Sequence, residues 1–406
     1  MTLIVDADAH VCEARDLFTE RLPSKYGDAI PHVKYRPEVS QDWWFVGDTP
    51  IEKAVGSVMV SGEHGEVRRA DQMSISGSIY DEQHPSSYAP NERVKVMDAY
   101  GIRAATTYPF LGLTGPDVWK ATEMSASLEF QVEVVKAYND WILTWATEQP
   151  GRFIPLGCLP YWNIEAAVAE IERCAEIGIK GMVMSGWPQN HGCPIFPDPQ
   201  WDPLWAAAQA ANFSLSFHSG GGGIGDSAYN PDRMRLLGQA QLTAWATTVE
   251  FLKNALSGID IVMSGVLNRF PELKFALIET GAGWVPFALE AMDVHYLRYR
   301  PWETNETFTR EETPSFLFRR QVFVTNWFEQ LVEGVPFENT MFETDYPHPT
   351  SLIGDEIQNA IQDNMTVLTS EQREDVLWRN ALRCFNLTPE DVGITEDMLG
   401  ADSSDS

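Results

Sequence analysis

A regular alternation of strand-like and helix-like segments sets the strongest limit on how this chain can fold. The strand-like segments are short and apolar, and they cover residues 103–108 (RAATTY), 153–159 (FIPLGCL), 181–184 (GMVM) and 213–217 (FSLSF). Segments with apolar residues at helical spacing lie between them, for example 128–147 and 163–177. Short strands that alternate with helices are typical of βα units, so we expect a parallel sheet.

Four further segments bring the number of expected strands to eight. They cover residues 3–8 (LIVDAD), 275–278 (FALI), 322–325 (VFVT) and 340–343 (TMFE). A ninth candidate, 259–263 (IDIVM), continues without a break into a helix-like sequence, and we do not count it. Eight βα units in one chain predict an α/β protein with a single closed (β/α)8 TIM barrel rather than an open sheet.

The segment between the first two strands has a different character. Residues from about 20 to 95 are rich in Pro, Gly, Ser and Trp and have few clear periodicities. We expect this segment to be an insertion that covers the mouth of the active site.

The barrel itself is expected to span residues 1–387. Residues 388–406 contain six acids and no Lys or Arg, and we expect them to form a flexible tail.

Composition argues against several classes of partner. The chain has 29 Lys and Arg against 58 Asp and Glu, a net charge of −29, which does not supply the basic surface that nucleic acids and anionic membranes require. It has no apolar run of about 18 residues and no signal peptide, so we expect a cytoplasmic protein. The cysteines are odd in number and lack C-x-x-C spacing, which argues against a disulfide framework and a thiolate zinc site: Cys12, Cys158, Cys174, Cys193 and Cys384.

Residues that can bind a divalent metal follow four of the eight expected strands. The first strand ends in Asp8-Ala9-His10, and His218 follows the fifth strand, Glu279 the sixth and Asp345 the eighth. In a parallel barrel the C-terminal ends of all strands lie on one rim, where active sites form. Each residue alone has an ordinary structural explanation. Together, two imidazoles and three carboxylates on one rim predict a metal site.

Two neighbouring motifs are weighed against this site. His348 lies three residues after Asp345, and we expect it to bind the metal, to orient a ligand or to contact the substrate. Residues 219–225 contain G-x-G-x-x-G directly after a strand. They lack the following helix and acidic residue of a dinucleotide site, so we expect a flexible loop at the rim.

These motifs resemble the amidohydrolase-2 family, which includes aminocarboxymuconate-semialdehyde decarboxylase and γ-resorcylate decarboxylase. The resemblance covers nearly the whole chain, and its most specific segments are 202–220 (DPLWAAAQAANFSLSFHSG), 264–287 (SGVLNRFPELKFALIETGAGWVPF) and 342–349 (FETDYPHP). It implies a (β/α)8 barrel that holds one divalent metal. The implied ligands are Asp8, His10, His218 and Asp345.

The chain departs from this family pattern in two places. Asp8 stands where the named decarboxylases have the first residue of H-x-H or E-x-H, and Glu279 stands where they have a catalytic His. Glu279 can transfer a proton if burial raises its pKa, or it can coordinate the metal. The additional carboxylates favour manganese or iron over zinc, and a second ion is an open alternative.

The sequence therefore predicts a metal-dependent amidohydrolase-superfamily enzyme, either a hydrolase or a carboxy-lyase. Its substrate is expected to be a small carboxylated or aromatic molecule, with Glu279 or Asp345 as proton carrier and His348 as a third catalytic candidate. Two other hypotheses stay open: an oxygenase with one or two non-haem irons, and a barrel that has lost catalysis. Related barrels often dimerise, so a homodimer is a candidate assembly.

Overall fold

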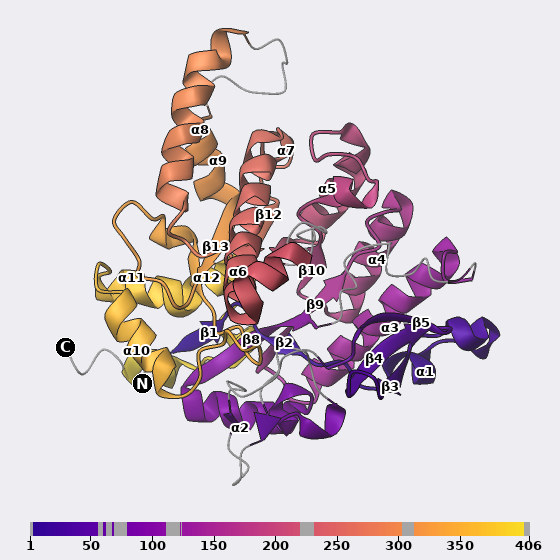
Figure 1. Cartoon of the computed structure of the whole chain (residues 1–406). Helices are drawn as coiled ribbons and strands as arrows, with labels where there is room; N and C mark the ends of the chain where they lie inside the picture. The colour runs from indigo at the N-terminus through magenta and orange to yellow at the C-terminus, as the bar shows by residue number, and fades with distance from the viewer. Residues whose placement is uncertain are drawn as a thin grey trace.

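A barrel of eight parallel strands forms the centre of the protein (Figure 1). The computed structural model describes residues 3–55, 60–61, 67–68, 79–110, 122, 124–219, 231–302 and 312–401. The strands follow one another around the barrel in chain order: β1 (Ile4–Asp6), β8 (Ile102–Pro109), β9 (Phe153–Cys158), β10 (Gly181–Met184), β11 (Ser214–His218), β12 (Lys274–Ile278), β13 (Val322–Asn326) and β14 (Thr340–Phe342). A short ninth strand, β2 (His10–Val11), follows β1 and also pairs with β8.

Backbone hydrogen bonds join the first strand to the last. The amide of Ala7 donates to the carbonyl of Phe342 at 2.9 Å, and the amide of Asp345 donates to the carbonyl of Asp8 at 2.9 Å. These bonds lie just beyond the regular ends of β1 and β14, so the ring continues past the strands toward the residues predicted to bind metal. The predicted (β/α)8 barrel is confirmed.

Helices cover the outside of the barrel, as expected for βα units. In α4, the side chain of Asn163 accepts a hydrogen bond from the amide of Ala166, and the helix ends at Gly178 with φ 107°, a conformation that favours glycine. The segment 259–263, which we do not count among the expected strands, is helical. The main helices are α2 (Pro90–Tyr100), α3 (Leu128–Thr147), α4 (Ile164–Ile177), α5 (Asp202–Ala210), α6 (Pro231–Met263), α7 (Val266–Arg269), α8 (Val285–Tyr299), α9 (Pro314–Gln321), α10 (Asp355–Asn364), α11 (Ser370–Glu374) and α12 (Asn380–Cys384).

The insertion between the first two large strands forms a sheet of its own. Its three antiparallel strands are β3 (His32–Arg36), β4 (Gln41–Val46) and β5 (Thr49–Lys53), and α1 (Leu17–Arg21) precedes them. The buried ring of Trp44 packs edge-on against Phe18 of α1 at 5.5 Å between centroids. This sheet lies beside α3 in Figure 1.

Residues 392–394 pack against the barrel, beyond the predicted boundary at 387. Val392 and Ile394 are buried in the main hydrophobic core, and Nε of Arg103 donates to the carbonyl of Gly393 at 3.0 Å. The acidic tail is therefore anchored at least as far as Ile394. Among the described residues, no helix is both long and apolar enough to cross a membrane.

Candidate metal centre

The five predicted ligands lie together at one rim of the barrel. Nε2 of His218 lies 3.3 Å from both carboxylate oxygens of Asp8. Nε2 of His10 lies 3.6 Å from Oδ1 of Asp8 and 3.8 Å from Oδ1 of Asp345. Glu279 completes a third group with Asp8 and Asp345, in which the donor atoms lie within 4.8 Å of one another. These groups share residues, so they form one centre rather than separate ones.

Both histidines are oriented by backbone carbonyl groups. Nδ1 of His10 lies 3.1 Å from the carbonyl of Pro109, and Nδ1 of His218 lies 3.0 Å from the carbonyl of Ser219. A carbonyl only accepts hydrogen bonds, so Nδ1 of each ring carries a proton. This arrangement directs Nε2 of both rings toward the carboxylates, which is how metal-binding imidazoles are commonly held.

Several buried polar atoms at this centre fit the requirements of a divalent cation. Oδ2 of Asp8, Nε2 of His10 and Oδ1 of Asp345 have no hydrogen-bond partner among the described residues. Each belongs to a buried side chain. Unpartnered buried polar atoms are costly, and a cation among them would satisfy all three at once. Nitrogen and oxygen ligands of this kind suit zinc, manganese or iron.

The carboxylates repel one another and hold their protons tightly. Burial raises the pKa of Glu279 to about 7 and keeps the pKa of Asp8 and of Asp345 above the usual range. Burial alone would lower the pKa of His218, but the charges of Asp8 and Glu279 outweigh it and raise that pKa to about 9. The centre therefore takes up positive charge readily, either as protons or as a metal ion.

Two of the residues that carry these carboxylates have an unusual backbone conformation. Glu279 has φ 54° and Asp345 has φ 60°, the left-handed region that glycine occupies most easily. Such residues cost on the order of 1–3 kcal/mol each and occur preferentially at functional sites. The hydroxyl of Thr350 donates to Oδ2 of Asp345, and the hydroxyl of Ser219 donates to Oε2 of Glu279. Each carboxylate is thus fixed by both its backbone and its side chain.

His348 and two aromatic rings lie beside the candidate metal ligands. The His348 ring meets the His10 ring at 4.4 Å between centroids, and Phe110 stacks on His348 at 4.8 Å. Tyr108 lies 5.0 Å from His218 by the same measure. Burial lowers the pKa of His348 to about 3, so the ring is neutral near pH 7. The structure places His348 within the cluster, where one of its nitrogens can join His10 and Asp345 around an ion.

Sequence reasoning missed Glu343 at this centre. Its buried side chain lies behind Glu279, with Oε2 3.4 Å from the Glu279 amide, and Oε1 has no hydrogen-bond partner in the described structure. Burial keeps its pKa well above the usual range. A signal was present, because Glu343 and Asp345 alternate in F-E-T-D as Asp6 and Asp8 do in V-D-A-D.

Arg93 of α2 was also missed, and it supports the centre from behind. Its Nη2 donates to the carbonyl of His10 at 2.6 Å, and its Nε donates to the carbonyl of Ser86 at 2.5 Å. The buried guanidinium lies 4.7 Å from the ring centroid of Tyr346, the residue after Asp345. One side chain therefore contacts both segments that carry predicted ligands.

The expected flexible loop at 219–225 lies outside the described residues from 220 onward.

Comparisons with known proteins agree with this architecture. The amidohydrolase family model (Amidohydro_2) matches residues 81–387. A γ-resorcylate decarboxylase of Polaromonas sp. (strain JS666 / ATCC BAA-500) is 25% identical over 313 residues, which cover 73% of this chain and 87% of that protein.

Solved structures share the fold over almost the whole chain. An amidohydrolase of Mycobacterium avium subsp. paratuberculosis K-10 aligns with a TM-score of 0.70 and 18% identity, covering 95% of this chain and 98% of that one. A dihydroxybenzoic acid decarboxylase of Polaromonas sp. JS666, solved with bound manganese and the inhibitor 2-nitroresorcinol, aligns with a TM-score of 0.59 and 17% identity over 97% and 100% of the two chains. The family match and the shared barrel establish that this chain belongs to the amidohydrolase family, as the resemblance in its sequence predicted.

Proposed function

We propose that this protein is a metal-dependent, non-oxidative decarboxylase of a small aromatic carboxylate. The observation that carries the proposal is the buried cluster of Asp8, His10 and Asp345, whose unpartnered atoms face one another at the barrel rim. Relatives named γ-resorcylate decarboxylase and dihydroxybenzoic acid decarboxylase support the choice of reaction and of substrate class.

Asp8, His10, His218 and Asp345 would hold one divalent ion. Manganese is favoured by the oxygen-rich ligand set, and it is the ion bound in the related dihydroxybenzoic acid decarboxylase. When bound, the ion would act as a Lewis acid that orients the substrate and neutralises negative charge on its oxygens. The overlap of the three donor groups favours a single ion over two.

Glu279 would supply the proton that replaces the carboxylate. In decarboxylation the carbon–carbon bond breaks, carbon dioxide leaves, and the electron pair left on the ring carbon takes up a proton. A carboxyl whose pKa is raised to about 7 is partly protonated at neutral pH, so it can donate that proton. His218 and Ser219 hold Oε2 of Glu279 in position, the former at 3.5 Å from Nδ1.

The ring-lined wall beside the cluster suits a flat substrate. Tyr108, Phe110 and His348 present aromatic rings next to His10 and His218. Aromatic rings favour stacked or edge-on contacts with another ring. A benzoate-type substrate could therefore direct its carboxylate toward the cluster while its ring contacts these side chains.

We also propose that the insertion covers one side of the active-site mouth. The hydroxyl of Tyr80 donates to the carbonyl of Glu13 at 2.9 Å, and Sγ of Cys12 lies 3.8 Å from the carbonyl of Ala54. Cys12 and Glu13 directly follow β2, which begins at His10. These contacts support a position for the insertion next to the predicted ligands.

A substrate panel tests the proposed reaction against hydrolysis and oxygenation. The manganese-loaded enzyme should release carbon dioxide from a hydroxybenzoate and form the corresponding phenol, both with and without oxygen. Esters and amides of the same acids serve as the comparison set. Turnover of only the esters or amides would assign a hydrolase, and a strict requirement for oxygen and iron would assign an oxygenase.

A further inference from the structure

The peptide group between Pro109 and Phe110 links two side chains from the segment that follows β1. Its carbonyl accepts a hydrogen bond from Nδ1 of His10 at 3.1 Å, and its N–H donates to Oε1 of Glu13 at 2.9 Å. This peptide bond is trans, so its carbonyl and its N–H point in opposite directions. Glu13, the peptide group and His10 therefore form one chain of hydrogen bonds, which we call the Glu13–His10 chain.

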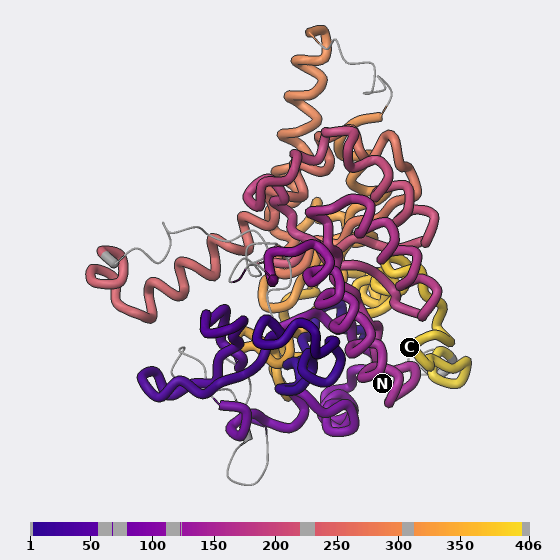
Figure 2. Tube along the Cα trace, turned by 90° about the vertical axis from the view of Figure 1, so that its right-hand side faces the viewer, coloured from indigo at the N-terminus to yellow at the C-terminus, as the bar shows by residue number. Residues whose placement is uncertain are grey.

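The position of Glu13 follows from the end of a strand. β2 pairs with β8 in parallel register, with Val11 opposite Pro109, and β2 ends at Val11. Two residues later the side chain of Glu13 accepts the hydrogen bond from the amide of Phe110. The backbone carbonyl of Glu13 accepts from the hydroxyl of Tyr80 in the insertion at 2.9 Å. Glu13 is thus held from the insertion, which Figure 2 shows in indigo beside the barrel, while its carboxylate is directed at β8.

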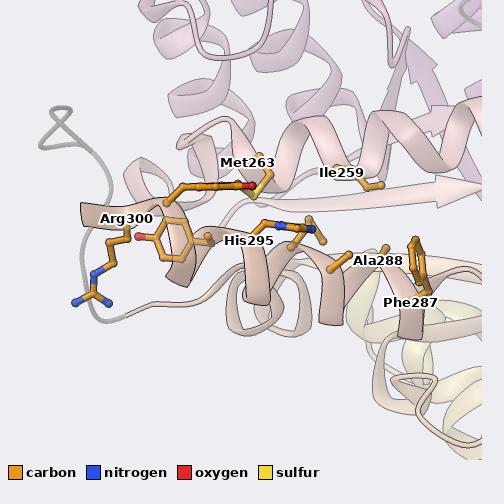
Figure 3. A pocket seen from close by; sticks show the side chains of 10 residues that line it. Ile259, Met263, Phe287, Ala288, His295 and Arg300 are labelled. Atoms are coloured by element: carbon orange, nitrogen blue, oxygen red, sulfur yellow. The ribbon is translucent and has the colours of Figure 1, made fainter. Parts of the chain in front are cut away.

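Both ends of the Glu13–His10 chain are buried. The side chain of Glu13 is in a residue only 1% exposed, and His10 is 3% exposed. Neither residue lines the outer groove of about 410 Å³ between α6 and α8 that Figure 3 shows. A hydrogen bond to a charged acceptor is roughly twice as strong as a neutral one, and hydrogen bonds in a poorly polarisable interior strengthen one another. The charge of Glu13 therefore acts on His10 through the peptide group.

This action concerns the nitrogen of His10 that faces the carboxylates. A stronger acceptor at Nδ1 fixes the tautomer of the ring and makes Nε2 a more basic ligand. Nε2 of His10 lies 3.6 Å from Oδ1 of Asp8 and has no hydrogen-bond partner in the described part of the chain. The Glu13–His10 chain thus ends at one of the buried atoms that a cation would satisfy.

We propose that Glu13 is a positioning residue that orients His10 and strengthens it as a metal ligand through the Pro109–Phe110 peptide group. The proposal rests on the proposed function in one respect, namely that His10 binds the metal. A purely structural Glu13 would only join the segment after β2 to β8, and its charge would have no effect on His10. An amide of the same size separates the two roles.

Glu13→Gln tests the role of the charge, because its side-chain oxygen can still accept from the amide of Phe110. The dissociation constant for manganese should rise roughly three- to tenfold. Glu20→Gln, at an exposed position on α1, is the matched control. Glu170→Gln is a second control that removes a buried carboxylate of α4, which is paired with Arg173 at 2.7 Å. Both controls should bind manganese like the wild type.

NMR of the metal-free protein with isotope-labelled histidine tests whether the effect passes through His10. The Hδ1 proton of His10, assigned by its absence in His10→Asn, should resonate at lower field in the wild type than in Glu13→Gln, because the charged chain gives the stronger hydrogen bond. Circular dichroism checks the fold. If Glu13→Gln does not fold, Glu13→Asp replaces it, because it keeps the charge but withdraws it from the amide of Phe110.

Manganese binding by the folded Glu13 variant that is as tight as in both controls would overturn the proposal. Weaker binding with an unchanged His10 resonance would also overturn it, because the effect would then not pass through His10. A wild type that binds no manganese would remove the proposed function instead. In that case the His10 resonance of the metal-free proteins would still decide whether Glu13 acts on this ring.

Discussion

His10 and His218 meet almost at right angles, with ring centroids 4.7 Å apart and ring planes at 84°. Each ring directs Nδ1 to a backbone carbonyl and Nε2 toward Asp8. The two residues lie on β2 and β11, far apart in the sequence. The barrel rim brings them together with Nε2 of both rings directed at the same carboxylate, and the predictions below follow from this geometry.

Asp8→Asn should weaken metal binding at least about 100-fold, because it replaces a charged ligand that faces both histidines with a neutral amide. Metal content after dialysis and a manganese titration measure this effect. Asp363→Asn, at an exposed position on α10, is the control and should bind metal like the wild type. Equal binding by both variants would remove Asp8 from the ligand set.

Glu279→Gln should lower the decarboxylation rate by about 100-fold or more while the metal content stays unchanged. The amide keeps the size of the side chain but cannot deliver the proton. Glu272→Gln, an exposed change close to β12, is the matched control. If Glu279→Gln loses the metal together with the activity, Glu279 is a ligand rather than the proton donor.

Metal binding should release protons and weaken as the pH falls from 8 to 6. Charged neighbours raise the pKa of His218 to about 9 against its burial, and burial raises the pKa of Asp8 and of Asp345 above the usual range, so the ligands of the metal-free centre hold protons that the ion must displace. Calorimetry in buffers of different ionisation enthalpy measures the released protons. Binding that is constant over this pH range would contradict the ligand assignment.

The same protons fix the sign of the effect on stability. A group whose pKa is higher in the folded state than in the unfolded state stabilises the fold increasingly as the pH falls through the folded value, here about 9 for His218. The metal-free protein gains from this uptake and the metal-bound protein does not. The increase in Tm that manganese causes should therefore shrink between pH 8 and pH 6 in thermal melts.

Arg93→Lys should lower the free energy of unfolding by about 2–4 kcal/mol and loosen metal binding about tenfold, because a lysine cannot bond the carbonyls of His10 and Ser86 in the same fork geometry. Chemical denaturation and the manganese titration measure the two effects. Lys95→Ala, an exposed change on the same helix, controls for the helix itself. A variant that loses stability but keeps full metal affinity would limit Arg93 to a structural role.

The barrel and the convergence of the candidate ligands could be predicted because strand ends in a parallel barrel share one rim. All eight expected strands are present, and Asp8, His10, His218, Glu279 and Asp345 converge as their positions at strand ends required. That inference needs only which residue follows each strand, and it is insensitive to small errors in the strand boundaries.

Other features depend on contacts that a single sequence does not reveal. The β3–β5 sheet packs on α1 through contacts such as that between Trp44 and Phe18. These two residues lie far apart in the sequence, so no helical or strand periodicity predicts their contact. Glu279 and Asp345 have a left-handed backbone although neither is a glycine, so their sequence does not indicate this conformation. The anchoring of the acidic tail rests on Val392 and Ile394, two apolar residues among many acids.

Titration of manganese into the metal-stripped protein, with carbon dioxide release from a hydroxybenzoate followed at each step, is the most direct test of a single catalytic ion at this centre. We expect activity to rise in proportion to occupancy and to reach its plateau at one ion per chain. Full activity in the metal-stripped protein, or no stoichiometric binding at any pH from 6 to 8, would contradict the proposed metal centre.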